Sequence, residues 1–207
     1  MKNPRFPTIV VATRNQGKLR EFQDLLLPLG SDILSLADMS IVEDFEETGQ
    51  TFAENARIKA VSYSRLVPYP VLADDSGLEV AELGGRPGVH SARYAGAGAS
   101  DSDRVQKLLG ELAASDGERA ARFVCNLALA QDGIVLHESE GECAGIIAAE
   151  PRGANGFGYD PVFYFPSLGK TLAELGEAEK NRISHRARAV SSLLDQLLPR
   201  TIVNRQS

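Results

Sequence analysis

Two long runs with strand character, separated by a three-residue turn, constrain the fold of this chain more than any other feature. They cover residues 119–130 and 134–147. Gln131-Asp132-Gly133 joins them, and an Asp-Gly pair between two such runs is a strong signal for a β-hairpin. We therefore expect a long antiparallel pair of strands that belongs to a second lobe, roughly residues 85–150.

Strand and helix patterns alternate in the first part of the chain. Thr8–Thr13 is a continuous run of β-branched and apolar residues, as in a strand buried on both faces, and Ile33–Leu36 is a second strand. Between them, Lys18–Leu29 has apolar residues at the spacing of a helix. This segment is predicted to be a strand, a loop and a helix, followed by the second strand.

Further elements follow along the chain. Thr51–Val67 is predicted to be a helix that begins with a capping box, because Thr51 and Glu54 can satisfy each other's backbone amides. Helices are also expected over residues 101–114 and before Pro199, where one apolar stripe consists of Ile183, Ala187, Val190, Leu194 and Leu197. Short strands are expected at residues 71–73 and 78–80, on either side of Asp74-Asp75-Ser76-Gly77.

Length and composition limit the class of protein. The 207 residues suffice for one substantial core, and a single domain over residues 1–207 is expected. A net charge of −6 argues against a nucleic-acid partner, because such binding needs a basic surface. No stretch resembles a signal peptide or a membrane span, so a cytoplasmic protein without a membrane partner is expected. Cys125 and Cys143 lack metal-ligand spacing and are predicted to be buried thiols.

The segment Thr13-Arg14-Asn15-Gln16-Gly17-Lys18 lies between the first predicted strand and the first helix. Free amides and the positive dipole end at a helix start favour a phosphate, and Lys18 would add a full charge. The segment lacks the GxxxxGK[ST] pattern of a Walker A loop. An ordinary turn and a phosphate-binding loop are therefore equally consistent with these residues alone.

Asp74-Asp75-Ser76-Gly77 follows a short apolar strand, and open α/β sheets usually bind ligands just beyond the carboxyl ends of their strands. Adjacent carboxylates resist joint ionisation unless a cation or hydrogen bonds compensate. Mg²⁺, which prefers oxygen ligands, would explain them. The alternative is an Asx-type turn with solvated acids.

Glu46 and Glu47 lie just before the helix that contains Lys59. A carboxylate at this place could complete a metal site. Acids before a helix also interact favourably with its dipole, and a lysine near the middle of a helix is usually solvated. The residues by themselves leave both interpretations open.

The stretch from Gly153 to Arg188 combines glycines, aromatic residues and a basic cluster. Glycines allow sharp turns close to a ligand, Phe157 and Tyr159 offer flat faces, and Ser184 is a plausible helix N-cap. The downstream hydrogen-bond donors are Lys180, Arg182, His185 and Arg186. This inventory fits a planar, oxygen-rich, anionic ligand.

Five segments in this order closely resemble the inosine triphosphate pyrophosphatase family. They are ATRNQGKLREF, EETGQTFAENARIKA, LADDSGLEVAELGGRPGVHSARYAG, GFGYDPVF and EKNRISHRARA. The resemblance extends over nearly the whole chain. It implies a mixed α/β fold with a long central twisted sheet flanked by helices, two lobes around an active-site cleft, and usually a homodimer. Apolar residues around 163–165 are a candidate dimer interface.

The resemblance also implies an activity. The family hydrolyses ITP, dITP and XTP to the monophosphate and pyrophosphate with Mg²⁺, which keeps deaminated purines out of DNA and RNA. By resemblance, the triphosphate is bound by Lys59 and by the loop Thr13, Arg14, Asn15, Gln16, Gly17 and Lys18. Arg14 stands where a small residue is often found, and it either adds a phosphate contact or points to solvent.

Further roles are implied by the same resemblance. Glu46 and Asp75 would bind Mg²⁺, with Glu47 as the alternative to Glu46, and Asp75 would be the general base for the attacking water. Asp74 would support the site and Ser76 would contact the substrate. Phe157 would stack on the purine beside Gly158, Tyr159 and Asp160, and the ring carbonyls would be read by Lys180, His185 and Arg186.

Base selection has a physical reason in this scheme. Hypoxanthine and xanthine carry a carbonyl at position 6, whereas adenine carries an amino group there, which would leave the donors of Lys180 and Arg186 unpaired. Two other functions are considered. A Maf-type nucleotide pyrophosphatase would prefer other modified bases, and a nucleotide sensor without catalysis would bind without turnover.

Overall fold

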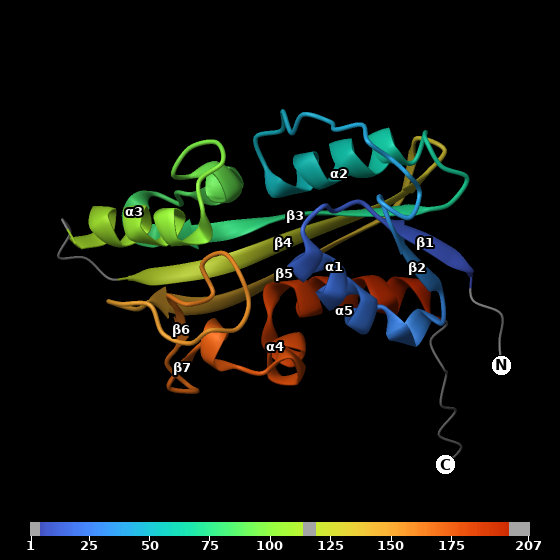
Figure 1. Cartoon of the computed structure of the whole chain (residues 1–207). Coiled ribbons are helices and arrows are strands. Elements are labelled where there is room, and N and C mark those ends of the chain that lie inside the picture. The colour runs from blue at the N-terminus through green and yellow to red at the C-terminus, as the bar shows by residue number, and fades with distance from the viewer. Residues whose placement is uncertain (1–4, 114–118, 199–207) are drawn as a thin grey trace, which may run out of the picture.

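The computed structural model describes residues 5–113 and 119–198 and has a mixed α/β architecture (Figure 1). Its centre is one seven-stranded sheet with the order β2-β1-β3-β4-β5-β6-β7. β1 runs parallel to β2 and β3, and the other neighbouring pairs are antiparallel. The strands are β1 (Thr8–Val11), β2 (Asp32–Ser35), β3 (Val71–Val80), β4 (Ala120–Gln131), β5 (Ile134–Ile147), β6 (Phe163–Phe165) and β7 (Lys170–Thr171).

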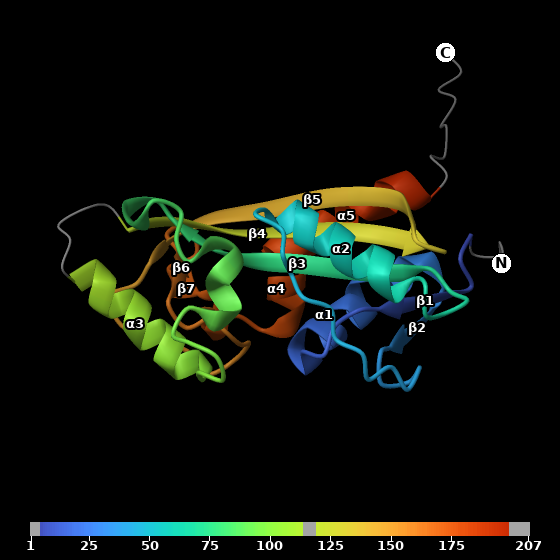
Figure 2. The ribbon, with the colours of Figure 1, turned by 90° about the horizontal axis from the view of Figure 1, so that it is seen from above.

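Helices cover both faces of this sheet. They are α1 (Gln16–Leu25), α2 (Phe52–Tyr63), α3 (Asp101–Ala113), α4 (Glu177–Ile183) and α5 (His185–Leu197). α2 packs on β3 and β4, whereas α5 packs on β4 and β5 from the opposite side (Figures 1 and 2). The predicted fold class, a mixed α/β fold with a twisted central sheet flanked by helices, is confirmed. The division into two lobes stays a prediction.

The long strands supply two cores because their side chains alternate between the faces. Leu72 and Leu127 are buried in a core with residues of α1 and α5. Ala73 and Ala128, each one residue further along, are buried in a core with residues of α2. A third core, at the far end of the sheet, brings residues of β3, β4 and β6 together with α3. The sheet is therefore buried on both faces along much of its length.

The predicted hairpin is confirmed. β4 and β5 pair over almost their whole length, and Gln131 pairs with Ile134 across a two-residue loop. Asp132 and Gly133 have φ angles of 52° and 79°, as a two-residue turn with two left-handed positions requires. The hairpin belongs to the same sheet as β1, β2 and β3.

The predicted helices exist, with differences at their ends. α1 ends at Leu25, and Leu27–Leu29, which contains a proline, continues as a short 3-10 turn. The capping box of Thr51 and Glu54 is present at the start of α2. The prediction that one C-terminal helix carries the whole apolar stripe is wrong, because the stripe is divided between two helices. Ile183 ends α4, and the extended Ser184 caps α5.

Asp74-Asp75-Ser76-Gly77 does not form the turn that the sequence suggested. These residues lie inside β3, which is one continuous ten-residue strand paired along its whole length with β4. Polar residues are tolerated here because their side chains find partners in loops and helices on both sides. This difference decides the geometry of the site described below.

Three further predictions concern burial. Cys125 and Cys143 are buried free thiols, as predicted. The residues around 163–165, predicted to offer a dimer interface, are occupied within the chain, because Phe163 and Phe165 are buried in the third core and Phe163 packs against Phe123. Among the described residues, none of the helices has the length and apolar character to cross a membrane.

Gly141 in β5 determines how closely α5 approaches the sheet. A Cβ atom at this position would lie 2.2 Å from the backbone nitrogen of Ala189 and 2.3 Å from the carbonyl oxygen of His185. Real Cβ atoms do not approach backbone this closely. Glycine at position 141 therefore allows the first turn of α5 to lie directly on the strand.

We expect Gly141→Ala to destabilise the protein by about 2 kcal/mol or more, because helix backbone must move to relieve the overlap. Urea denaturation measures this change. Gly110→Ala in α3 is the matched control, since an added Cβ there meets nothing within 4 Å. It should stabilise the protein by up to about 1 kcal/mol through helix propensity. Equal stabilities of Gly141→Ala and the wild type would contradict the close approach.

Candidate active site

The candidate site is built on a free edge of β3. β1 pairs with β3 only at Val71 and Leu72, and the Ala12 N–H then donates to the Leu72 carbonyl (2.8 Å). β3 continues to Val80, so Asp74–Gly77 face the loop that follows β1. The loop after β1 therefore lies at the carboxyl end of β1, as expected. The two acids lie beside this loop, within β3, which continues beyond the end of β1.

Adjacent acids of β3 point to opposite faces of the sheet, because side chains alternate along a strand. Asp74 contacts Lys18 of α1, and Asp75 contacts Asn55 of α2. The two carboxylates therefore lie on opposite faces of the sheet and have different hydrogen-bond partners, although the charges of Lys18 and Lys59 act on both. Their pKa values shift in opposite directions.

Asp74 is buried and lies among cations. Its Oδ2 atom accepts hydrogen bonds from Lys18 Nζ (2.7 Å) and Ser76 Oγ (2.9 Å), and it lies 3.6 Å from Nη2 of Arg186. Burial alone would raise the pKa of Asp74, but Lys18 and Arg186 outweigh burial and hold this pKa well below its usual range. Asp74 is thus a fixed negative charge that holds two cations in place.

Asp75 is also buried, but its surroundings raise its pKa. Burial raises the pKa of Asp75 to about 6, Lys59 opposes this shift, and the charge of Glu47 adds to it. Asn55 Nδ2 donates to Asp75 Oδ2 (3.0 Å), and the Ser76 N–H donates to Oδ1 (3.0 Å). A carboxylate that is held in place and titrates near neutral pH is well suited to accept a proton.

The loop after β1 presents amides at a helix start. Asn15 is the N-cap of α1, and its Oδ1 atom accepts the Lys18 N–H (3.0 Å). Among the described residues, the N–H groups of Gln16 and Gly17 in the first turn have no hydrogen-bond partner. Thr13 accepts the Asn15 N–H and fixes the loop (3.2 Å). These features favour the phosphate-binding interpretation over an ordinary turn.

Arg14 has a role that the sequence did not predict. Its Nη2 atom donates to the carbonyl oxygens of Val42 (3.1 Å) and Glu43 (2.7 Å). The side chain is exposed, and these two hydrogen bonds occupy one nitrogen of its guanidinium. It connects the loop after β1 to the irregular segment that carries Glu46 and Glu47.

The structure distinguishes the two glutamates of that segment. Glu47 Oε1 lies 2.9 Å from Nζ of Lys59, and its charge acts on Asp75. Glu46, the predicted metal ligand, is exposed and has no hydrogen bond or ion pair within the described residues. Lys59 is not the solvated lysine typical of a mid-helix position, because its side chain is only 13% exposed and Asp74 and Glu47 raise its pKa against the effect of burial.

The glycine-rich segment forms the loop expected from the sequence. Gly156 and Gly158 have φ angles of 77° and 63°, which glycine adopts without strain. The Phe157 ring packs on Gly17, where an added Cβ would lie 2.6 Å from Cδ1 of the ring. Tyr159 is largely buried in the third core, and its hydroxyl donates to the Ser91 carbonyl (2.9 Å), but it also contributes to the lining of the pocket described below.

Of the four predicted donors of the C-terminal segment, Lys180, His185 and Arg186 are buried, whereas Arg182 is exposed. Lys180 donates to Asp160 Oδ2 (2.5 Å), and His185 stacks on Phe123 with ring centroids 4.7 Å apart. Burial lowers the pKa of His185 well below its usual range, and the nearby Arg186 adds to this effect, so the imidazole is neutral. His185 Nδ1 and Arg186 Nε are buried and have no hydrogen-bond partner among the residues that the structure describes. Such unpaired polar atoms point to a bound ligand.

Sequence reasoning missed several residues that hold this site together. Glu21 bridges two of the predicted base-reading residues, since its carboxylate lies 2.8 Å from Lys180 Nζ and pairs with Arg186. In the sequence, Glu21 is one of the polar residues of a helix that is recognised only by its apolar stripe. Asn55, which holds Asp75, is likewise an unremarkable residue of a helix in the sequence. Only the fold brings them to the site.

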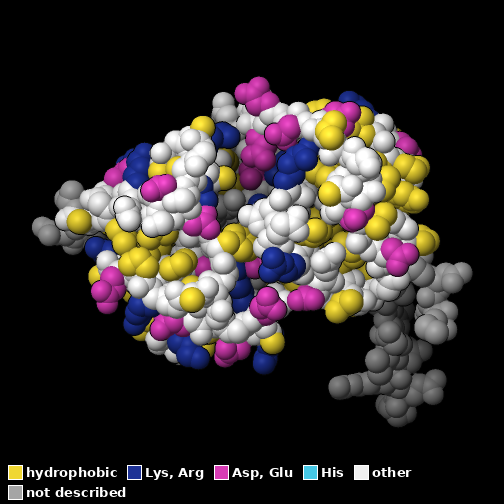
Figure 3. All heavy atoms as spheres, viewed as in Figure 1, with side chains coloured by type: hydrophobic (Ala, Val, Ile, Leu, Met, Phe, Trp, Pro, Cys, Tyr) yellow, Lys and Arg dark blue, Asp and Glu magenta, His cyan; other side chains and the backbone are white. Residues whose placement is uncertain are grey.

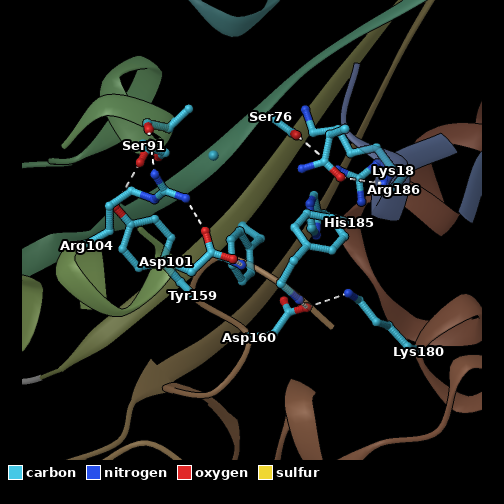
Figure 4. Close-up of a pocket in the computed structure, with 16 residues that line it drawn as sticks. Lys18, Ser76, Ser91, Asp101, Arg104, Tyr159, Asp160, Lys180, His185 and Arg186 are labelled. Atoms are coloured by element: carbon cyan, nitrogen blue, oxygen red, sulfur yellow. Dashed lines mark hydrogen bonds and ion pairs between the residues drawn. The ribbon is translucent and has the colours of Figure 1, made fainter. Parts of the chain in front are cut away.

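One pocket brings together some of these residues (Figure 4). Of the predicted residues, those that line it are Asn15, Lys18, Ser76, Phe157, Gly158, Tyr159, Asp160, Lys180, His185 and Arg186. Thr13, Arg14, Gln16, Gly17, Glu46, Lys59 and Asp75 lie outside its lining. Figure 3 shows the molecular surface hollowed near its middle, with acidic and basic side chains at the rim.

Comparisons with known proteins agree with this geometry. The sequence pattern of the Ham1 family matches residues 9–196. The chain belongs to the Ham1 family. It is 54% identical over 192 residues to a protein of Geobacillus kaustophilus named dITP/XTP pyrophosphatase, covering 91% of this chain and 93% of the relative. A Bacillus licheniformis protein of the same name is 52% identical over 192 residues, with coverages of 91% and 98%.

Solved structures of the Ham1 family share this fold. A Ham1 protein from Coxiella burnetii superposes with a TM-score of 0.83 at 49% identity, covering 92% of this chain and 98% of that one. The resemblance to the inosine triphosphate pyrophosphatase family is thereby confirmed. The Maf-type alternative receives no support from these relatives.

We expect the Asp75 carboxyl to titrate with a midpoint near pH 6 in the metal-free protein, because burial keeps it protonated above its ordinary pKa of 3.8. Carboxyl ¹³C NMR measures this midpoint. Glu47→Gln should lower it by removing a like charge, whereas Glu46→Gln should leave it unchanged. A midpoint near 4 in the wild type would contradict the described environment.

Proposed function

We propose that this chain hydrolyses the deaminated purine nucleoside triphosphates ITP, dITP and XTP to the monophosphate and pyrophosphate. The observation that carries the proposal is one pocket that brings together a cation-bearing helix start, an aromatic ring and buried polar atoms that have no partner among the described residues. The names of the relatives support the same activity. Such an enzyme removes deaminated purines before they enter DNA or RNA.

The triphosphate end uses charge and amides. Lys18 and the free N–H groups of Gln16 and Gly17 bind phosphate oxygens, and Lys59 adds positive charge beside Asp75. These groups are held before substrate arrives, so they stabilise the charge that develops on the leaving pyrophosphate without reorganisation. Asp74 keeps Lys18 in its place.

Asp75 acts as the general base. Its carboxylate accepts a proton from the attacking water, while Asn55 and the Ser76 amide fix the direction of its two oxygens. A pKa near neutrality lets the carboxylate be ionised at physiological pH and still accept a proton in the transition state.

Mg²⁺ is the cofactor we propose, and the donor set fits it. Among the described residues, no three His, Cys, Asp or Glu side chains gather as a self-sufficient metal site. Mg²⁺ often needs only one or two carboxylates, with water and substrate phosphates as its other ligands. Asp75 and Glu47 are the pair favoured by the geometry, in place of Asp75 and Glu46. When bound, the ion would neutralise phosphate charge.

The base end selects oxygen at position 6. Lys180 and Arg186 are donors held by Glu21, and the neutral His185 offers one donor nitrogen. Adenine, with an amino group at position 6, would offer no acceptor to a donor that the protein leaves unsatisfied, such as Arg186 Nε, and such mismatches discriminate strongly. Phe157 stacks on the purine. Homodimer formation and a location in the cytoplasm accompany this proposal as predictions from the family resemblance.

Pyrophosphate release from ITP, XTP, GTP and ATP, with Mg²⁺ and with EDTA, tests the proposal. We expect metal-dependent release from ITP and XTP only. Asp75→Asn should lower kcat at least about 100-fold, because the base is lost while the shape is kept. Asp195→Asn, an exposed acid of α5, is the matched control and should be fully active. Binding without release would identify a nucleotide sensor instead.

The two candidate metal ligands are separated by titration with Mg²⁺ at saturating ITP. We expect Glu47→Gln to raise the Mg²⁺ concentration for half-maximal activity by about tenfold or more. Glu46→Gln, a change of the same chemistry one residue away on an exposed side chain, should shift it less than about twofold. The opposite order of effects would return the role to Glu46.

A further inference from the structure

We propose that Asp101, the first residue of α3, is a positioning residue that sets the direction of the Phe157 ring through the Gly158 amide. Asp101 lies on the side of the pocket opposite Lys18 and Arg186 (Figure 4). The inference rests on the proposed function, because it assigns the effect to recognition of the purine and not to that of the phosphates.

Two carboxylates hold the two amides that flank the Cα atom of Phe157. The Phe157 N–H donates to Asp160 Oδ2 (2.9 Å), and the Gly158 N–H donates to Asp101 Oδ2 (2.6 Å). These amides belong to the peptide groups on either side of that Cα. When both peptide groups are fixed, the direction of the Cα–Cβ bond from which the ring projects is fixed as well. The contacts of the ring with Gly17 and Lys180 then hold its orientation.

Asp101 is itself held in place by Arg104, with which it forms an ion pair. Nη1 of Arg104 donates to the carbonyl oxygens of Ala92 (3.0 Å) and Ala99 (2.6 Å). The pair is thereby attached to the 3-10 segment Gly88–Arg93 and to the chain before α3. The hydrogen bond to Gly158 thus joins two segments 57 residues apart in the sequence.

The position of the Phe157 ring matters to its neighbours. The ring packs on Gly17, and Lys180 Nζ lies 4.7 Å from its centroid. A rotation of the loop would remove both contacts. Loss of the Asp101 contact should therefore weaken binding at the base end more than at the phosphate end, because the start of α1 is held by its own Asn15 cap.

A simpler role for Asp101 would be to stabilise the start of α3. Asp103 does this directly, because its carboxylate accepts hydrogen bonds from the Ser100 N–H (2.9 Å) and hydroxyl (2.7 Å). Asp103 has no contact with Gly158 in the described structure. The two acids of one helix turn therefore provide a matched pair of variants.

The test compares Asp101→Ala, Asp101→Asn and Asp103→Ala. Calorimetric titration with the two products, inosine monophosphate and pyrophosphate, measures each end of the pocket separately. We expect Asp101→Ala to weaken inosine monophosphate binding about tenfold and pyrophosphate binding less than about twofold. Asp101→Asn, which keeps one acceptor oxygen, should have a smaller effect, and Asp103→Ala should change neither affinity.

Hydrogen exchange in the ligand-free protein gives a second readout. Exchange of the peptide that contains Gly158 should become faster in Asp101→Ala and not in Asp103→Ala. Unchanged exchange, equal weakening of both products, or the same effects in Asp103→Ala would overturn the inference. A wild-type protein that fails to bind inosine monophosphate would contradict the proposed function instead, and the exchange data would still decide whether Asp101 holds the loop.

Discussion

The alternation of side chains along β3 is the constraint on which the site depends. Because β3 continues past the end of β1, two adjacent acids remain in a paired strand and must point to opposite faces. Both acids are buried. Asp74 lies among cations that keep it ionised, whereas burial and the charge of Glu47 raise the pKa of Asp75 to about 6. The alternation along β3 thus gives two neighbouring aspartates different surroundings. Asp74 becomes a structural charge and Asp75 a candidate base, although the two side chains are chemically identical.

The helices on the two faces supply what each acid needs. α1 and α5 bring Lys18 and Arg186 to Asp74, whereas α2 brings Asn55 and Lys59 toward Asp75. The close packing of α5 on Gly141 fixes the helix start that carries His185 and Arg186. The packing of helices on both faces of the sheet therefore determines the surroundings of the two acids, and the charges of Lys18 and Lys59 act on both of them.

Sequence reasoning predicted much of this and failed for physical reasons elsewhere. The hairpin, the capping box of α2 and the Ser184 cap were predictable because each depends on neighbouring residues. The continuity of β3 was not, because Asp-Asp-Ser-Gly has turn character locally and only pairing with β4 keeps it extended. The roles of Glu21 and of Arg14 were equally hidden, since both depend on partners distant in the sequence. The family resemblance supplied residue roles that no local pattern contains.

The placement of Lys18 and Glu21 on one helix has a consequence for substrate shape. The two residues are three positions apart on α1, about one helical turn. Lys18, the proposed phosphate contact, pairs with Asp74, and Glu21 pairs with Lys180 and Arg186, the proposed base contacts. A helix rises only about 1.5 Å per residue and does not stretch. α1 therefore fixes the spacing between these two groups of contacts, and under the proposed function it would limit the length of nucleotide that can reach both.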